Sequence, residues 1–560
     1  MVTIVTLDLI KTSRKDGYKI FFAFTLALLW QAPMLAAQTA GPASSTPSKV
    51  WAADNGDGTY KNPILYADYS DPDAIRVGND FYMVASSFNA VPGLPVLHSK
   101  DLVNWSLIAH ALPEQPPRDV YSKPQHGNGV WAPAIRYHNG EFYIFYPDPD
   151  YGIYLVKART PDGPWSKPLL VKEAKGWIDP CPLWDDDGKA YLVSAMAASR
   201  SGIKSILVVS RMKPDGTSLL DDGVMVFDGH DKNPTVEGPK FYKRNGYYYI
   251  FAPAGGVETG WQLALRSKNV YGPYEQKIVL AQGKTAINGP HQGAWVETAL
   301  GESWFIHFQD QGAYGRVVHL QPMKWINDWP VIGIVPGNQG PGEPVLSYKK
   351  PNAGKLWPVS TPPDSDEFNK NRIGLQWQWP ANPKTNWMFP AGSLGFVRLF
   401  NMPLPEGFQN FWDVPNLLLQ KFPGPEFTAT TKVTFTPRAD GEKTGLIVMG
   451  LDYAYLSVKK TPDGLVISLT TCKDADKHSP ERESTAIAMK GDNVYLRVQV
   501  FKDAITEFSY RTDATTFTKV GEKFTARQGR WIGAKVGIFA VGKGQARESG
   551  YADFDWFRFE

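Results

Sequence analysis

The sequence contains little cysteine, no strong excess of charge of one sign and no apolar run long enough to span a membrane. Cys181 and Cys472 are its two cysteines, and they fall in different predicted domains. We therefore expect two buried free thiols and a fold that does not depend on disulfide bonds. The 59 basic and 56 acidic residues give a net charge of +3. This near-balance provides no electrostatic footprint for nucleic acid or for an anionic membrane, so no nucleic-acid partner is expected.

The longest N-terminal apolar run, residues 20–30, has the features of an export signal. Basic residues precede it, and the small residues Ala36 and Ala37 follow it. A run of this length is too short to cross a bilayer, and this order of segments is typical of a secretory signal peptide. We predict a signal peptide over 1–37 and a short linker over 38–58. The protein is then secreted or periplasmic, with no membrane attachment after cleavage.

A repeat indicates the architecture of the first two-thirds of the chain. Long amphipathic helices are missing between Lys61 and Gly340, where short β-rich runs alternate with turn residues. A glycine followed three residues later by an aromatic residue recurs five times, at Gly78, Gly140, Gly188, Gly246 and Gly301. A spacing of roughly 50 to 60 residues suits a four-stranded propeller blade. The repeat predicts a five-bladed β-propeller over residues 59–345.

The first strand of each blade lines the central channel of a propeller, and it must precede the glycine turn. Seven to ten positions before the five glycines stand Asp71, Trp131, Asp179, Glu237 and His291. Each has an ordinary explanation when taken alone, since an Asp before Pro often makes a turn. Three acids, an aromatic ring and an imidazole at one mouth are costly to bury together unless they serve a function. We therefore predict that these five residues form the functional site.

The rest of the chain reads as a second β-rich domain. Residues 346–364 are rich in proline and turn residues and are predicted to be a linker. Alternating apolar and polar segments over 365–560 predict a β-sandwich of the jelly-roll type, which makes the whole chain all-β. Sugar binding, calcium binding and covering of the active-site mouth are all compatible with such a domain. Structural support is the first expectation.

Five blocks of the first domain carry a resemblance to a known family. They read NPILYADYSDPDAIRVGNDFYMV, GVWAPAIRYHNGEFYIFY, GWIDPCPLWDDDGKAYLV, TVEGPKFYKRNGYYYIFAPAGG and GPHQGAWVET. In this order they resemble glycoside hydrolase family 43, the five-bladed propeller family of β-xylosidases and α-L-arabinofuranosidases. Through DSDEF, GLQWQW and DFDWF, the C-terminal part resembles the concanavalin-A-like sandwich of the family's β-xylosidases.

The resemblance implies separate roles for the three acids. Asp71 would be the general base, Glu237 the general acid, and Asp179 the residue that orients the acid and raises its pKa. An inverting glycosidase needs such an acid and base about 6.5–9.5 Å apart, with room for water between them. This chain departs from the family in carrying Asp73, where a small residue is usual two places after the base. Asp73 is therefore the alternative base.

Four further residues match positions around the family's sugar pocket. Phe88 and Trp131 match aromatic residues of the pocket wall, with blade packing as the alternative. Arg316 matches an arginine that reaches the substrate, which a planar donor group suits; a salt bridge between blades is its alternative. His291 matches a channel histidine associated with a metal or water site. No cofactor is expected to be required, and a structural calcium ion is a candidate at His291.

The resemblance implies an inverting exo-hydrolase that releases terminal β-D-xylose or α-L-arabinofuranose from plant hemicellulose oligosaccharides or side chains. α-L-Arabinofuranosidase as the main activity is the first alternative. Endo-arabinanase fits less well, because those chains commonly lack such a sandwich. A catalytically inactive carbohydrate-binding propeller is the alternative from a different class, and the presence of all three carboxylates argues against it.

Overall fold

The computed structural model describes residues 46–337, 340–513, 515–542 and 549–560. The predicted signal peptide over 1–37 and the first part of the predicted linker lie outside these ranges. Within the described ranges, no helix is both long and apolar enough to cross a membrane.

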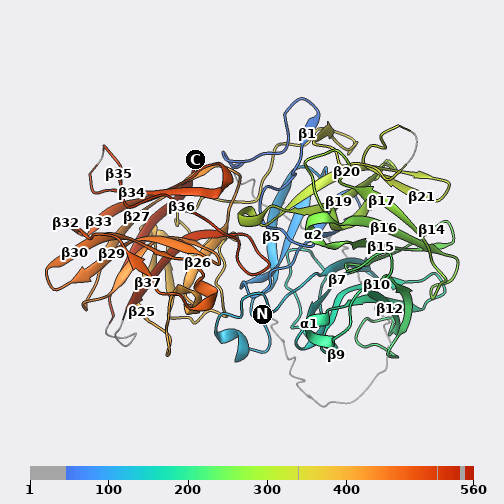
Figure 1. Ribbon diagram of the computed structural model, residues 1–560, viewed down its shortest axis with the longest axis horizontal. Helices are drawn as coiled ribbons and strands as arrows, with labels where there is room; N and C mark the ends of the chain where they lie inside the picture. Colours follow the sequence, from blue (N-terminus) through green and yellow to red (C-terminus); the bar gives the residue numbers. More distant parts are fainter. Residues whose placement is uncertain (1–45, 338–339, 514, 543–548) are drawn as a thin grey trace, which may run out of the picture. The chain divides into compact units, whose positions relative to one another are not determined.

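Five four-stranded antiparallel sheets form the first domain, each with its strands paired in sequence order (Figure 1). Blade 1 consists of β2 (Asp73–Val77), β3 (Asp80–Val84), β4 (Gly93–Ser99) and β5 (Trp105–Leu112), and blade 2 of β6 (Ala134–His138), β7 (Glu141–Asp148), β8 (Gly152–Ala158) and β9 (Leu169–Glu173). Blade 3 consists of β10 (Trp177–Trp184), β11 (Ala190–Met196), β12 (Ile206–Met212) and β13 (Val224–Asp228). Blade 4 consists of β14 (Lys240–Arg244), β15 (Tyr247–Ala254), β16 (Trp261–Ser267) and β17 (Glu275–Ala281), and blade 5 of β18 (His291–Glu297), β19 (Ser303–Asp310), β20 (Arg316–Ile326) and β21 (Trp329–Ile332). The predicted five-bladed propeller is confirmed.

A glycine turn joins the first two strands of every blade, at the five glycines that carry the repeat. Their φ angles lie between 61° and 82°, a region that only glycine enters without steric cost. A Cβ atom added at Gly78, Gly140, Gly188 or Gly301 would meet no atom within 4 Å. The backbone conformation of the turn, and not lack of space, therefore explains the repeated glycine.

The ring of blades closes where the chain leaves the propeller. The first strands of blades 1 and 5, β2 and β18, contact each other. Apolar side chains of both blades, among them Phe81, Trp105, Trp304 and Leu320, share one buried cluster. Strand β1 (Thr59–Lys61) pairs with β22 (Ser347–Lys349), which lies within the segment predicted as a linker. The start and end of the propeller are thus held together by backbone hydrogen bonds.

Two eight-stranded sheets form the predicted sandwich. One has the order β23 (Met388–Ala391), β24 (Phe396–Phe400), β38 (Tyr551–Phe559), β27 (Phe427–Thr436), β33 (Asn493–Val500), β34 (Ile505–Arg511) and β35 (Thr518–Lys519), with β36 (Phe524–Thr525) also paired to β34. The other has the order β25 (Met402–Pro403), β37 (Lys535–Gly542), β28 (Lys443–Met449), β29 (Tyr453–Thr461), β30 (Gly464–Cys472) and β31 (Arg482–Glu483), with β26 (Leu417–Lys421) on β37 and β32 (Ile487–Met489) on β30. Inward-facing side chains of both sheets, such as Leu446 and Val498, form one buried core between them.

Helices are short in the described chain. They are α1 (Ala198–Ser201), α2 (Gly256–Thr259) and the 3₁₀ turns η1 (Val120–Ser122), η2 (Gly312–Tyr314), η3 (Gly392–Leu394), η4 (Phe411–Asp413), η5 (Ala475–Lys477) and η6 (Lys502–Ala504). Both cysteines are buried free thiols, as the sequence predicts.

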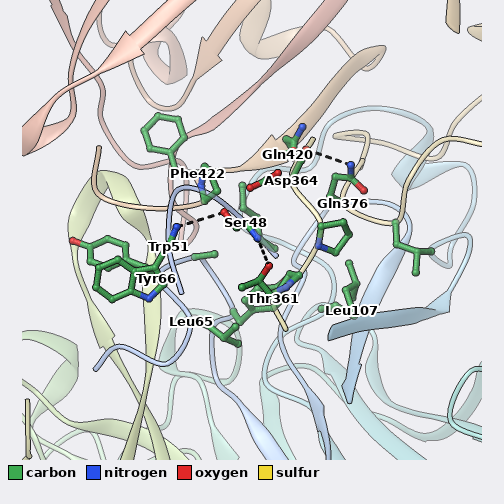
Figure 2. Close-up of a pocket in the computed structure, with 18 of the residues that line it drawn as sticks. Ser48, Trp51, Leu65, Tyr66, Leu107, Thr361, Asp364, Gln376, Gln420 and Phe422 are labelled. Atoms are coloured by element: carbon green, nitrogen blue, oxygen red, sulfur yellow. Dashed lines mark hydrogen bonds between the residues drawn. The ribbon is translucent and has the colours of Figure 1, made fainter. Parts of the chain in front are cut away.

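The propeller and the sandwich are joined by direct contacts. The backbones of Val91 and Trp379 exchange two hydrogen bonds, and the ring of His126 stacks on that of Trp412 with 3.5 Å between centroids. A cavity of about 60 Å³ lies between the propeller, the segment before the sandwich and the sandwich itself (Figure 2). None of the predicted site residues lines it. This cavity is therefore separate from the site described next.

Candidate active site

The five predicted channel residues lie at the same end of the first strand in their blades. Asp71, Trp131 and Glu237 stand just before β2, β6 and β14, whereas Asp179 lies within β10 and His291 begins β18. In each blade the chain enters the channel at this residue and leaves it at the glycine turn. The register of the repeat therefore placed all five at one mouth.

Asp71 is buried among hydrogen-bond donors. Its Oδ2 accepts hydrogen bonds from the hydroxyls of Ser70 at 2.7 Å and Ser86 at 2.5 Å. Its Oδ1 accepts from Nη1 of Arg316 at 3.0 Å, so the carboxylate has a cationic partner. Its φ angle of 54° is uncommon for a residue with a side chain and reorients the chain directly before β2.

Asp179 and Glu237 form a coupled pair of acids. Oδ2 of Asp179 accepts a hydrogen bond from the backbone N–H of Gly238 at 2.7 Å, which fixes the segment that carries Glu237. Burial, followed by the charge of Asp71, raises the pKa of Asp179 to about 7. Burial, followed by the charge of Asp179, raises the pKa of Glu237 to about 8. The Glu237 side chain is nevertheless 35% exposed, so it is protonated near neutral pH and still accessible to a ligand.

Asp73, the alternative base, has a different environment. It is fully buried, and its Oδ2 accepts from the backbone N–H of Ile135 at 2.7 Å and from Nη1 of Arg136 at 2.6 Å. The carboxylate therefore ties blade 1 to blade 2. The Asp73 side chain is 0% exposed, whereas that of Asp71 keeps 7% exposure, and this difference favours Asp71 as the base.

Arg316 begins β20 and reaches the residues before blade 1. Its Nη1 donates to Ser70 Oγ at 2.8 Å as well as to Asp71, and its guanidinium lies 4.9 Å from the centre of the Phe308 ring. Both interpretations of Arg316 have a structural basis. It forms a salt bridge from blade 5 to the residue before blade 1, and it also borders the carboxylates that would surround a substrate. Its Nε points elsewhere and lies 3.8 Å from Oδ2 of Asp310.

The two predicted wall residues differ in accessibility. The rings of Phe88 and Trp131 are 6.4 Å apart at an angle of 59°. Phe88 is buried, whereas Trp131 is partly exposed and donates from Nε1 to the backbone oxygen of Gly127 at 2.9 Å. Trp131 is therefore the one of the two whose side chain reaches solvent.

Two residues at this mouth were missed by the sequence analysis. Trp531, in a loop of the sandwich, is 51% exposed, meets the Trp131 ring edge-to-face at 6.4 Å and lies 6.0 Å from the Arg316 guanidinium. The Arg200 guanidinium, from α1, lies 5.4 Å from the Trp131 ring centre and pairs with Asp150 at 3.1 Å. No local sequence pattern marks Trp531, because its position depends on how a loop of one domain meets the other.

His291 is buried beside the acid. Its Nε2 lies 3.4 Å from Oε1 of Glu237 without the alignment of a hydrogen bond, and burial lowers its pKa to about 3, so the ring is neutral. Calcium requires several oxygen ligands, and one carboxylate near a nitrogen does not supply them. Among the described residues, no group of three or more His, Cys, Asp or Glu side chains could hold a metal ion. A calcium ion at His291 stays a prediction without support from these side chains.

The arrangement provides one carboxyl group with a raised pKa and a second one that is bonded to a cation. Glu237 can donate a proton near neutral pH, whereas the Asp71 carboxylate is paired with Arg316 and can accept one. A proton donor and a proton acceptor in one site are suited to general acid and general base roles in one reaction.

The sequence and the fold of the chain are similar to those of known proteins. The family described as "Glycosyl hydrolases family 43" matches residues 60–330, and "Beta xylosidase C-terminal Concanavalin A-like domain" matches residues 365–560. A candidate β-xylosidase of Xylanibacter ruminicola is 41% identical over 88% of both chains, and a β-xylosidase of Formosa agariphila is 31% identical over 92% of this chain and 94% of its own. A non-reducing-end α-L-arabinofuranosidase of Bacteroides ovatus is 29% identical over 90% and 94%. The crystal structure of a xylan β-1,4-xylosidase from Bacillus halodurans superposes with a TM-score of 0.79 at 25% identity, over 89% of this chain and 99% of that one.

Proposed function

The chain belongs to glycosyl hydrolases family 43, and from this membership we propose that it is an exo-acting glycosidase that removes a terminal pentose from hemicellulose oligosaccharides with inversion. One observation carries the assignment of roles. Burial and Asp179 keep Glu237 protonated near neutral pH, while Asp71 lies beside Arg316 as a carboxylate. An inverting glycosidase needs one carboxyl group in each of these states.

The proposed reaction uses each carboxyl once. Glu237 gives its proton to the glycosidic oxygen as the bond from that oxygen to the anomeric carbon breaks. A water molecule attacks the same carbon from the opposite side and loses a proton to Asp71. The products are the free pentose of inverted configuration and the shortened chain, with Glu237 ionised and Asp71 protonated. Return of the proton to Glu237 through solvent restores the starting state.

Arg316 and Asp179 have supporting roles in this scheme. Arg316 holds Asp71 through Oδ1, which leaves the orientation of the carboxylate fixed while it accepts a proton. Asp179 holds the backbone next to Glu237, and in its ionised form it adds to the effect of burial in raising the pKa of the acid. Neither residue needs to touch the leaving group to act in this way.

Exo-cleavage is supported by the residues around the mouth. Trp531 of the sandwich and Arg200 of α1 both approach Trp131, so the mouth is bordered by side chains from two blades and from the second domain. A site bordered on several sides admits the end of a sugar chain more readily than its middle. Flat rings at such a border stack on the apolar faces of sugars.

The sugar is proposed from the relatives. Two of the relatives named above carry the name β-xylosidase and one is an α-L-arabinofuranosidase that acts at the non-reducing end. We assign terminal β-D-xylose from xylo-oligosaccharides as the main substrate and α-L-arabinofuranose as the second. Export to the periplasm or the medium, inferred from the pattern over residues 1–37, would bring the enzyme to such oligosaccharides.

Release of p-nitrophenol from the β-D-xyloside and the α-L-arabinofuranoside tests the activity and ranks the two sugars. ¹H NMR of the first-formed product then reports the configuration at the anomeric carbon. We expect inversion; a product of retained configuration would exclude the mechanism with Asp71 and water. Sugar binding without release from either glycoside would instead support a carbohydrate-binding propeller.

A further inference from the structure

The buried carboxylate of Asp68 lies outside the predicted site and bonds to two segments that border it. Asp68 is 4% exposed, and its Oδ1 accepts a hydrogen bond from the backbone N–H of Arg316 at 3.0 Å. Its Oδ2 accepts from the backbone N–H of Gly533 at 3.1 Å, in the sandwich loop that carries Trp531. One side chain therefore holds both the residue that pairs with Asp71 and the loop that borders the mouth.

The close approach around Asp68 depends on two glycines. A Cβ atom on Gly315 would lie 2.6 Å from atoms of Asp68, and one on Gly533 would lie 2.8 Å from the backbone nitrogen of Gly315. Real Cβ atoms do not come this close to other heavy atoms, so neither position can carry a side chain without movement. The sandwich loop, the turn before β20 and Asp68 are thus packed directly against one another.

The loop has backbone anchors on both sides of Trp531. The N–H of Leu451 donates to the oxygen of Gln528 at 2.8 Å, and the N–H of Ala534 donates to the oxygen of Ala313 in the propeller at 2.7 Å. Between these two anchors, Asp68 is the propeller side chain bonded to the loop backbone. Loss of its carboxylate would therefore release the Trp531 side of the loop first.

Two lysines, the half-buried Lys421 and the buried Lys535, add an electrostatic reason for a carboxylate at this position. Burial lowers the pKa of Lys421 and, together with the charge of Lys421, lowers that of Lys535 to about 7. The negative charge of Asp68 raises the pKa of both and so opposes these effects. A neutral residue in place of Asp68 would leave two cationic side chains at the domain interface without this compensation.

We propose that Asp68 is a positioning residue that couples docking of the sandwich loop to the orientation of Arg316, so that the Trp531 border and the Asp71–Arg316 pair form together. The expected effect of Asp68 on catalysis rests on the proposed function. Its role in docking the sandwich loop does not depend on that function. Asp68 touches neither the sugar nor the reacting atoms, and it acts through Arg316 and Gly533.

A double-mutant cycle tests the coupling. Asp68→Asn should lower kcat/KM for the aryl xyloside by about 10- to 100-fold, because displacing positioning groups by about 1 Å has effects of this size. The same substitution in a Trp531→Ala background should cost at least threefold less, since the border is already lost. Strictly additive losses would overturn the coupling.

Asp101→Asn is the matched control. Asp101 is a buried carboxylate of blade 1 that accepts from the backbone amides of Val103 and Asn104 and pairs with Lys350 at 2.8 Å. This variant should lower the melting temperature but change kcat/KM less than twofold. Equal kinetic losses in Asp68→Asn and Asp101→Asn would mean that Asp68 acts only through stability.

A measurement that does not depend on enzyme activity, the rate of cleavage by trypsin, separates this inference from the proposed function. Arg530 is exposed in the loop, so trypsin can cut after it when the loop leaves the propeller. Mass spectrometry of the full-length protein during brief digestion should show cleavage after Arg530 several times faster in Asp68→Asn than in wild type or Asp101→Asn. Unchanged cleavage would overturn the docking role even if the wild type proves inactive on every glycoside. If Asp68→Asn fails to fold, Gly533→Ala displaces the loop from the other side, because its Cβ would meet the backbone of Tyr314 and Gly315. Cleavage after Arg530 that stays at the wild-type rate in this variant would overturn the docking of the loop.

Discussion

Replacement of Glu237 by glutamine tests the assignment of the acid most directly. The side chain keeps its size, and because it is 35% exposed and 3.4 Å from a neutral His291, no buried hydrogen bond is lost. The amide can donate a hydrogen bond to the leaving oxygen but cannot transfer a proton. General acid catalysis contributes roughly 10²- to 10⁴-fold, which is about 3 to 5 kcal/mol of transition-state stabilisation. We expect a loss of this size in kcat on xylo-oligosaccharides with the fold preserved.

The leaving group provides the internal control for this variant. p-Nitrophenolate departs with little help from an acid, so Glu237→Gln should lose much less activity on the aryl xyloside than on xylobiose. Steady-state kinetics on both substrates, with circular dichroism to monitor the fold, give the comparison. If more than a few per cent of the activity on xylobiose remains, the acid has been assigned wrongly. Equal losses on the two substrates would point to a role other than proton donation.

The same variant predicts a change in stability with pH. The pKa of Glu237 is about 8 in the folded protein against an ordinary value of 4.5, so the unfolded chain loses this proton first as pH rises. Wild type should therefore lose stability relative to Glu237→Gln between about pH 4.5 and 8, and match it near pH 4. Only the sign is predicted, because solvent screens a side chain that is one-third exposed. A wild type that melts above the variant at pH 8 would contradict the raised pKa.

Three further substitutions have distinct expected outcomes. Asp179→Asn removes the like charge beside Glu237 and lowers the pKa of the acid, so the alkaline limb of the kcat/KM profile should move to lower pH; an unmoved limb would exclude the tuning role. Asp71→Asn should reduce kcat on aryl and natural glycosides alike, by about 10²- to 10⁴-fold, because a good leaving group does not replace the base. A loss confined to xylobiose would argue against that assignment. Trp531→Ala should raise KM for xylobiose more than it lowers kcat, as measured by initial rates. An unchanged KM would argue against contact between Trp531 and the substrate.

The ring of blades could be predicted because its signals are local. A glycine turn needs positive φ at one residue, and the strand that follows it begins a fixed distance later, so both recur with the blade. The same register placed Asp71, Asp179 and Glu237 at the mouth without any knowledge of contacts. The raised pKa values of Asp179 and Glu237 could not be predicted in this way, because they depend on burial and on charges carried by other blades.

The different environments of Asp71 and Asp73 could not be predicted from the sequence. Two residues apart in an extended strand, their side chains would point the same way. Asp71 instead has φ of 54°, so the chain turns before β2 and sends the two carboxylates to different neighbours. The roles of Trp531 and Asp68 were equally hidden, since Gly533 lies 465 residues from Asp68 along the chain. Contacts of such separation leave no periodic trace in a single sequence.

Positive φ angles at the two ends of the first strands point to where the chemistry lies. At the turn end, as at Gly78, glycine adopts this conformation without cost. At the mouth end, Asp71, Asp179, Thr235 and Gln292 adopt it in or beside the channel segments of blades 1, 3, 4 and 5, although their side chains make it unfavourable. Such strain costs about 1–3 kcal/mol per residue and persists where the surrounding structure fixes it. Glycine would relieve the strain at Asp71 and Asp179 but would remove the carboxylates. Asn139 and Asn245 adopt positive φ in the turns as well, directly before Gly140 and Gly246. At Asp71 and Asp179, by contrast, the residues that adopt it carry the carboxylates of the channel, and this is the pattern expected where backbone strain orients functional side chains.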